Sequence, residues 1–296
     1  MSRSTLAVTL RFAGALLLAA LGEVRAEQPA GERNPDPTPP LGLLPTSDDA
    51  LVDPRMARSW ASAPPRAFLA TTVDVGFIYL RPRVSFGYGR PFTSWLGADA
   101  NPIVSRGGLG GYAGARLEIP HLDLRIGPRF FSAFEHTYLQ PKPSYSRLDL
   151  ETSTGARAQT LTFEAELDLW LRIGPGRALL RGSGSYITGV PDGLSVFEET
   201  LRVIVDAPLV WRARLAYVFV FGAYQQHSIG PALDILDVPK REDSRTLRFG
   251  PMLRLGLSRR VEVRGSFLTT LVSPDRIGLV GGDFTELGVR YRWATE

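Results

Sequence analysis

The feature that most constrains this chain is a long alternation of apolar and polar side chains that recurs along most of its length. Residues 163–173 alternate apolar residues with mostly charged ones, and residues 247–257 repeat the pattern. Successive side chains of a β-strand point to opposite faces, so each segment has one apolar face and one polar face. None of these segments keeps a helical period of 3.6 residues. The pattern therefore predicts an all-β fold.

The length of these segments narrows the fold further. Soluble strands usually have about five or six residues, whereas a tilted strand needs about 9–11 residues to cross a bilayer. We expect ten strands, near residues 71–90, 106–119, 121–136, 159–173, 177–189, 199–206, 209–224, 245–258, 260–273 and 284–293. Pro82, Pro128 and Pro251 fall inside these strands. Because proline cannot donate to a ladder, they predict bulges there, or a hairpin at residues 81–83 and a different count.

The expected connections alternate strictly between short and long. Tight turns fall at residues 120–121, 174–176, 207–208 and 258–259, and longer connections fall at 91–105, 137–158, 190–198, 225–244 and 274–283. Outer-membrane barrels have this pattern, with short periplasmic turns and longer surface loops. An even strand number places the first and the last residue of the barrel on the periplasmic side, which eight or twelve strands satisfy as well as ten. The sequence thus predicts a closed up-and-down antiparallel transmembrane β-barrel of about ten strands.

The N-terminal part of the chain predicts export. Residues 1–26 carry Arg3 and Arg11, an apolar core at 12–21 and small residues before a cleavage site at Ala26, as in a secretory signal peptide. An N-terminal amphipathic helix is the alternative. Residues 27–69 are rich in proline, which disfavours helix and sheet, and predict a mostly disordered periplasmic tether. The barrel is expected over residues 70–296.

Alternation alone does not say which face points inward. In a membrane barrel the apolar face points outward, because lipid surrounds it and the closed sheet pairs every backbone group. Export, strand length and mixed charge signs within single strands favour this form over a soluble sheet with a solvated outer face. The predicted lumen charges are Arg116, Glu118, Arg125, Glu164, Glu166, Asp168, Arg212, Arg214, Arg248, Arg254, Glu262, Arg264, Glu286, Arg290 and Arg292.

The last predicted strand resembles a known signal. Residues 288–293 (GVRYRW) alternate and end on Trp293, which resembles the C-terminal assembly signal of Gram-negative outer-membrane proteins. Here three residues follow the aromatic, whereas the signal ends on it. The resemblance implies a small barrel in the outer membrane, with membrane lipid and the barrel-assembly machinery as partners. Trp211 and Trp293 are expected as membrane-interface aromatics at the periplasmic rim.

Little in the sequence indicates chemistry. The chain has no Cys, and it contains no P-loop, nucleophile elbow or zinc-protease helix, so we expect no cofactor and no metal. The net charge of +4, which falls to +2 without residues 1–26, argues against nucleic acid as a partner. His136 and His227 are weak catalytic candidates, expected at the outer rim near acidic residues. That layout is similar to surface proteases of the omptin type, although none of their local signatures is evident.

These features favour a non-enzymatic outer-membrane barrel with a structural or surface-interaction role. The long loops at 137–158 and 225–244 are expected to carry that role, since loops on rigid scaffolds commonly bind partners. The surface ligand is not specified by the sequence. A narrow pore that favours anions is an alternative, because arginines outnumber acids among the predicted lumen charges. A hydrolase at the rim that uses His136 or His227 is another alternative.

Overall fold

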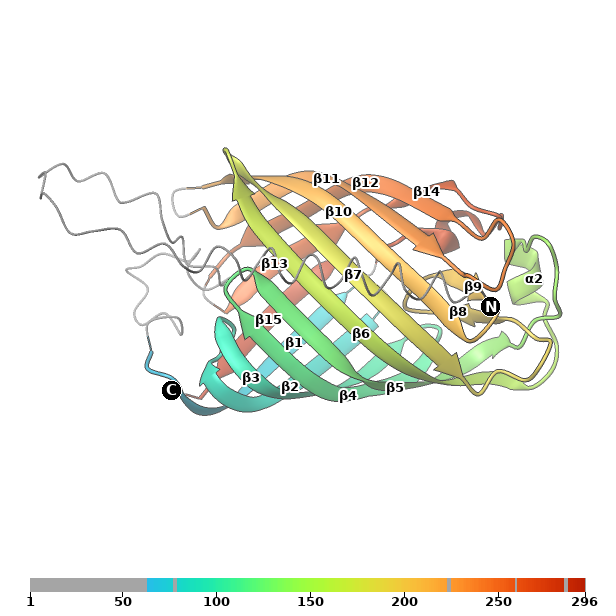
Figure 1. Cartoon of the computed structure of the whole chain (residues 1–296), viewed down its shortest axis with the longest axis horizontal. Helices are drawn as coiled ribbons and strands as arrows, with labels where there is room; N and C mark the ends of the chain where they lie inside the picture. Colours follow the sequence, from blue (N-terminus) through green and yellow to red (C-terminus); the bar gives the residue numbers. More distant parts are fainter. Residues whose placement is uncertain (1–62, 77–78, 223–224, 259, 285–286, 296) are drawn as a thin grey trace, which may run out of the picture. The chain divides into compact units, whose positions relative to one another are not determined.

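Twelve strands close into an antiparallel barrel in the computed structural model, which describes residues 63–76, 79–222, 225–258, 260–284 and 287–295 (Figure 1). The strands of the wall are β1 (Arg66–Gly76), β2 (Tyr79–Arg90), β3 (Ser94–Ser105), β4 (Gly108–Ile119), β5 (Leu122–Thr137), β6 (Arg157–Ile173), β7 (Gly176–Thr188), β10 (Leu209–Phe221), β11 (His227–Asp237), β12 (Thr246–Gly256), β13 (Val261–Ser266) with β14 (Thr269–Val272), and β15 (Gly288–Ala294).

Each strand pairs with its neighbour along the wall, and the ring closes where β15 meets β1. Asp74 lies opposite Arg290 in that seam, and Ala70 lies opposite Ala294. The segments β13 and β14 share one position, because both pair with β12. A closed ring leaves no long open edge whose backbone groups lack partners. The prediction of a closed antiparallel barrel is therefore confirmed.

The predicted number of about ten strands is wrong, because the wall has three strands that the prediction lacks and lacks one that it includes. The expected strand 71–90 is two strands, since β1 ends at Gly76 and β2 begins at Tyr79. The expected loops 91–105 and 225–244 contain β3 and β11. The expected strand 199–206 is not part of the wall, because only β9 (Val203–Val205) forms there, and it pairs with β8 (Val196–Glu198) in a separate hairpin.

The connections define two ends of the barrel. We call the end with connections 91–93, 120–121, 174–175, 222–226 and 257–260 the turn end, and the end with 138–156, 189–208, 238–245 and 273–287 the loop end. The chain enters β1 and leaves β15 at the turn end, as an even strand number requires. The expected tight turn at Ala207-Pro208 lies at the loop end instead, since the whole segment 189–208 is one long connection.

The prolines within strands do not produce the expected bulges. Pro82 pairs with Val73, Pro128 with Phe163 and Pro251 with Pro231, and the register is the same on both sides of each proline. The register shifts occur elsewhere, between Ser132 and Thr137 and between Leu247 and Arg248. The hairpin expected at residues 81–83 is also absent, because β2 runs through them.

Hydrophobic packing is concentrated at the loop end. One buried cluster joins Val203, Val205 and Leu201 of the hairpin segment to the wall residues Ile187 and Leu236. A second cluster packs Phe197 and Ile204 against Tyr145, Leu150 and Ile277 of the neighbouring loops. The short helix α2 (Arg147–Glu151) and the 3-10 turn η3 (Gly278–Gly281) belong to these loops. The long loops thus pack on one another and on the β8–β9 hairpin.

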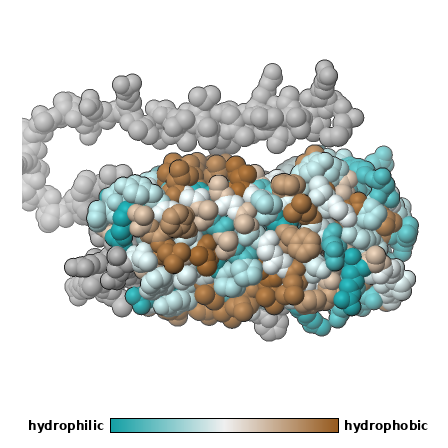
Figure 2. All heavy atoms as spheres, turned by 90° about the horizontal axis from the view of Figure 1, so that it is seen from below, coloured by the Kyte–Doolittle hydropathy of each residue, from teal (hydrophilic) through white to brown (hydrophobic). Residues whose placement is uncertain are grey.

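The outward face of the wall is apolar. Phe86, Tyr88 and Leu96 are 64%, 65% and 61% exposed, and many other large apolar residues of the wall are also exposed. Figure 2 shows apolar residues in patches along the flank of the barrel and hydrophilic residues gathered toward one end. Water disfavours so much exposed apolar surface, and lipid accommodates it. The arrangement is therefore the inverse of a water-soluble barrel.

The N-terminal boundary of the barrel differs from the predicted one. The wall begins at Arg66, four residues before the predicted start at 70. The expected signal peptide 1–26, its cleavage site at Ala26 and most of the tether 27–69 lie outside the described residues, so these stay predictions. In the part of the chain that the structure describes, no helix has both the length and the apolar character needed to cross a bilayer.

Candidate functional site: an arginine-rich lumen

The polar face of each strand points into the barrel, where its charges form ion pairs between neighbouring strands. On β6, Glu164 and Glu166 face arginines of β5: Glu164 accepts from Arg129 at 2.8 Å, and Glu166 from Arg125 at 2.8 Å. On the other side of β6, Asp168 accepts two hydrogen bonds from Arg181 of β7, at 2.6 and 2.9 Å. The alternation read from the sequence is thus the direct cause of a charged interior.

A network at the turn end is centred on Arg116 of β4. Its guanidinium donates to Asp123 at 2.7 and 2.9 Å, to Glu118 at 3.1 Å and to Asp99 at 3.3 Å. Trp95 also donates to Glu118, at 2.8 Å. One arginine therefore compensates three carboxylates here, and this part of the lumen is the more acidic part.

The balance is reversed around Glu262 of β13. Arg254 lies 2.9 Å from this carboxylate, Arg264 3.2 Å and Arg292 3.3 Å, measured from nitrogen to oxygen. The Glu262 side chain is only 1% exposed. Arg290 lies farther from it, at 3.9 Å, and instead donates to Asp74 at 2.5 and 2.9 Å. Several arginines thus depend on one fully enclosed carboxylate.

A third network joins the wall to the loop end. Arg212 and Arg214 of β10 both donate to Asp283, and Arg212 also donates to Asp234 at 2.6 Å. Arg248 of β12 lies 3.5 Å from Asp234. Asp234 and Asp283 are buried behind these arginines, so the guanidinium groups separate the carboxylates from the lumen.

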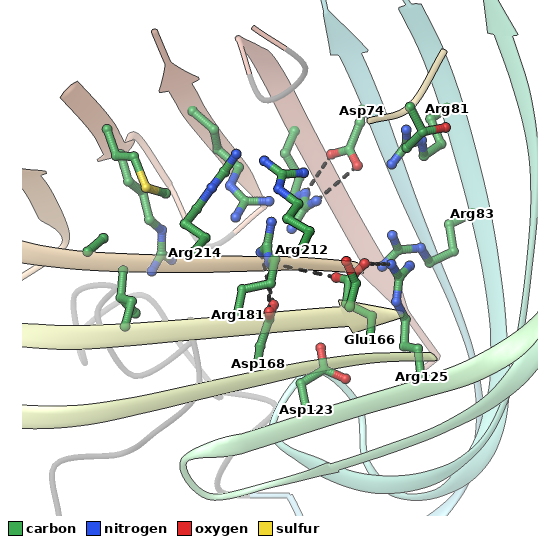
Figure 3. A pocket seen from close by; sticks show the side chains of 18 of the residues that line it. Asp74, Arg81, Arg83, Asp123, Arg125, Glu166, Asp168, Arg181, Arg212 and Arg214 are labelled. Atoms are coloured by element: carbon green, nitrogen blue, oxygen red, sulfur yellow. Dashed lines mark hydrogen bonds and ion pairs between the residues drawn. The ribbon is translucent and has the colours of Figure 1, made fainter. Parts of the chain in front are cut away.

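These side chains surround a cavity of about 340 Å³ in the lumen. Among the described residues that line it are twelve arginines but only six carboxylates, because Asp99, Asp234, Glu262 and Asp283 lie behind the lining. Figure 3 shows arginines projecting into this space from several strands. The surface that a solute would meet inside the barrel is therefore strongly positive.

The hairpin β8–β9 covers the cavity at the loop end. Thr200 and Leu201, between the two strands, line the cavity. Arg248 donates to the carbonyl oxygens of Leu201 and Arg202, each at 2.8 Å, and Arg129 forms an ion pair with Glu198 at 2.8 Å. We call residues 196–205 the cap. Lumen arginines hold it, so the cap and the charged interior form one structure.

The structure places most of the predicted lumen charges inside the barrel. The lining of the cavity includes Arg116, Glu118, Arg125, Glu164, Glu166, Asp168, Arg212, Arg214, Arg254, Arg264 and Arg290. Arg248, Glu262 and Arg292 are buried in the ion-pair networks next to it. Glu286 lies outside the described residues.

Sequence reasoning missed several charges that matter most here. Arg81 and Arg83 line the cavity from β2, and Arg181 lines it from β7. A single strand over 71–90 would place Asp74 and Arg81 on opposite faces, whereas in the structure they are cross-strand partners on β1 and β2. A turn signal at 77–78 would have corrected this, but that segment reads as apolar and aromatic.

The two histidines do not share a site. His136 lies at the loop end, with its ring 5.3 Å from that of Phe197 in the cap. His227 is the first residue of β11, at the turn end, with its ring 5.3 Å from that of Phe221. The expected placement of His227 at the outer rim is wrong, because the predicted loop 225–244 contains the wall strand β11, which begins at the turn end. No cluster of three metal-ligating side chains occurs in the described part of the chain.

The two tryptophans also lie at opposite ends. Trp293 is near the end of β15, at the turn end, as expected. Trp211 is the third residue of β10 and therefore lies at the loop end, not at the same rim; its side chain is 39% exposed on the outer face. A wall strand at 199–206, as the sequence predicts, would place the start of β10 at the turn end. Because the segment 189–208 contains no wall strand, β10 begins at the loop end.

No family model and no curated protein matches this chain. Among solved structures, it is similar to OmpT, described as an outer membrane protein of Vibrio cholerae, folded in vitro and in a trimer form. The two sequences are 8% identical, the match covers 77% of this chain and 98% of that chain, and the TM-score is 0.31. The proposals below therefore rest on the geometry of this barrel.

Proposed function

We propose that this protein is a Gram-negative outer-membrane barrel that admits small anions into an arginine-rich lumen. The observation that carries the proposal is the twofold excess of arginines over carboxylates in the cavity lining. An enclosed wall of one charge sign raises the local concentration of oppositely charged solutes, because the low-dielectric barrel focuses the field. The apolar outer face supports a place in a membrane.

The cap controls access to the lumen from the loop end. Thr200 and Leu201 close the cavity at the loop end, and Arg129 and Arg248 hold them. A solute that crosses the barrel must therefore displace the cap or pass beside it. The cap acts as the gate of the proposed route, and anions that compete for Arg129 and Arg248 favour its release.

The remaining expectations stay predictions. A surface-interaction role through the loops would use segments that here pack on one another, and segment 225–244 supplies wall strand β11 with only 238–245 as loop. A rim hydrolase would have to use His136, near Glu199 of the cap, since His227 lies at the other end. For neither role does the structure provide an observation as direct as the arginine-rich lining of the cavity.

Planar-bilayer recording of the refolded full chain tests the proposal. In a potassium chloride gradient, the reversal potential is expected to have the sign that corresponds to chloride passing more readily than potassium. Replacing residues 197–204 by a Gly-Ser linker of equal length should raise the conductance several-fold, because the gate is removed. Glu151→Gln, on exposed α2, is the matched control and should leave the conductance unchanged.

Two results would contradict the proposal. The first is a reversal potential of the opposite sign, which would mean that the arginines do not set selectivity. The second is the absence of current steps from the capless variant although it migrates as a folded barrel in unheated gels, which would mean that the lumen is a sealed structural interior.

A further inference from the structure

Two lumen arginines stand apart from the ion-pair networks. Arg81 and Arg83 lie two residues apart on β2, so both point into the barrel. No carboxylate of the described residues forms an ion pair with either one, and the Nε atoms of both are buried without a hydrogen-bond partner. The Arg83 side chain is almost fully enclosed, with the residue 9% exposed. The Arg81 guanidinium lies 5.5 Å from the centre of the Tyr79 ring.

The acids closest to these arginines already have partners. Asp74, opposite Arg81 on β1, accepts two hydrogen bonds from Arg290. Asp99, which attracts Arg83, accepts from Ser85 at 2.6 Å and from Arg116 at 3.3 Å. Among the described residues, these nearby acids therefore offer no free carboxylate to compensate Arg81 and Arg83.

A third arginine increases the local positive charge. Arg125 of β5 lines the same cavity as Arg81 and Arg83, and its own partner is Glu166 at 2.8 Å. Figure 3 shows the side chains of Arg81, Arg83 and Arg125 around the same part of the lumen. Three guanidinium groups thus repel one another around one space, an arrangement that an anion would relieve.

Two further polar groups next to this space lack partners. The hydroxyl of Tyr112 and the side-chain oxygen of Asn101 are buried without a hydrogen bond, and both residues line the cavity with 4% of their surface exposed. Arg125 lies over the Tyr112 ring, 5.5 Å from its centre. A buried hydroxyl that donates to nothing is costly, so it is a ready donor for a bound anion.

We propose that Arg81, Arg83 and Arg125, with the Tyr112 hydroxyl, form a binding subsite for the phosphate group of a small solute. Planar guanidinium groups donate in pairs to phosphate oxygens, and a doubly charged tetrahedral anion can accept from several of them at once. A chloride ion carries one charge and has no such geometry. The inference rests on the proposed function, since it names the anion that the lumen is built to hold.

Isothermal titration of the purified full chain in detergent, with inorganic phosphate as the probe, tests this subsite. The double variant Arg81→Gln/Arg83→Gln should weaken phosphate binding by about a hundredfold, because two charged hydrogen-bond donors are lost. The matched control Arg177→Gln/Arg181→Gln removes the same charge from the lining at the turn end, and should weaken binding far less. Equal weakening in both variants would overturn the subsite and leave only a diffuse positive field.

A second ligand and a thermal measurement complete this test. Glycerol 3-phosphate in place of inorganic phosphate distinguishes a bound ester from the free ion, and binding of either supports the subsite. If the double variant does not fold, the thermal midpoint of the unmodified chain replaces it as the readout. Phosphate should raise that midpoint more than chloride at equal ionic strength, and equal effects of the two anions would overturn the proposal.

The outcomes separate this inference from the proposed function. An anion-directed reversal potential without phosphate binding would remove the subsite and keep the anion route. Phosphate binding that depends on Arg81 and Arg83, combined with a cation-directed reversal potential, would keep the subsite and remove the route.

Discussion

At the scale of single residues, the fully buried carboxylate of Glu262 contacts more arginines than the half-buried carboxylate of Glu166 does. Glu262 is 1% exposed and lies within 3.3 Å of three arginines, whereas the Glu166 side chain is 28% exposed and lies within that distance of Arg125 alone. Removing one partner of a buried ion pair leaves a charge that neither water nor protein compensates. The half-buried pair of Glu166 and Arg125 is expected to contribute less, since water that reaches it screens the two charges.

We therefore expect Glu262→Gln to destabilise the barrel strongly. The loss should be about 3–5 kcal/mol in the free energy of unfolding, because three arginines lose a shared carboxylate. Glu166→Gln serves as the control and should cost about 1 kcal/mol or less. Urea unfolding in detergent, followed by tryptophan fluorescence, measures both. Equal destabilisation by the two variants would show that burial does not set the value of these pairs.

For many charged residues, the sequence predicts that the side chain points into the lumen, because successive side chains of a strand alternate between its two faces. Glu164, Glu166 and Arg254 were placed on the inner face from alternation alone, and they line the cavity. Partner choice could not be predicted, because it depends on register between strands. Arg81 has no carboxylate partner among the described residues because Asp74, which lies opposite it, pairs with Arg290, a residue more than two hundred positions away.

At the scale of elements, strands with clean alternation could be predicted, and the two strands β3 and β11 could not. β6 alternates without a break and was expected at nearly its full extent. β11 contains Gly230 and Pro231, and β3 contains Pro102, and both lie in segments that the sequence predicts as loops, although β5 and β12 are predicted as strands despite Pro128 and Pro251. The regular pairing of neighbouring residues holds these segments as strands, which is a tertiary effect that local propensity does not contain.

The cap is an element that carries its own pH dependence. Burial raises the pKa of Glu199 above its usual range, opposed by the attraction of Arg202 and His136, while Glu198 adds to the rise. The closed cap therefore binds a proton at Glu199 more readily than an open, solvated cap does. The closed cap therefore becomes more stable relative to the open cap as the pH falls through the raised pKa of Glu199. Below the usual glutamate pKa of about 4.3, Glu199 is protonated in both states and the gain in stability stops.

We expect acidification from pH 7.5 to pH 5 to increase protection of the cap's backbone amides against hydrogen exchange. Protection factors are the readout, because they remove the intrinsic pH dependence of exchange. Glu199→Gln is neutral at both pH values and should lose most of this response. An equal gain in the variant, or a loss of protection on acidification in the native chain, would show that Glu199 does not control the cap.

At the scale of the whole molecule, the strand number decides what the interior can do. Eight strands leave room for little besides side chains, and sixteen to eighteen leave an aqueous channel. With twelve strands, the lumen holds ion-pair networks and still leaves a cavity of about 340 Å³. The expected ten strands implied a nearly closed interior, so the larger barrel strengthens the case for a solute inside it.

The general architecture could be predicted because it follows from the contrast between the apolar face and the polar face of each strand. Long alternating strands must place their apolar face against either a core or lipid, and the described wall places it outward, with Phe86 and Tyr88 more than 60% exposed. The cap could not be predicted, because β8 and β9 are three-residue strands with buried side chains throughout, so they show no alternation.

The most direct test of the account is lipid contact at labelled positions of the wall. The chain has no Cys, so a single introduced thiol carries a fluorescent label at one known position. Labels at Phe163→Cys and Tyr186→Cys, on the exposed apolar face, should be quenched by lipids brominated in their acyl chains. Labels at Ser183→Cys and Ser185→Cys, on the cavity lining, should not be quenched by these lipids. Quenching at the two serine positions and not at the aromatic ones would show that the charged face meets the lipid, and the account would be wrong.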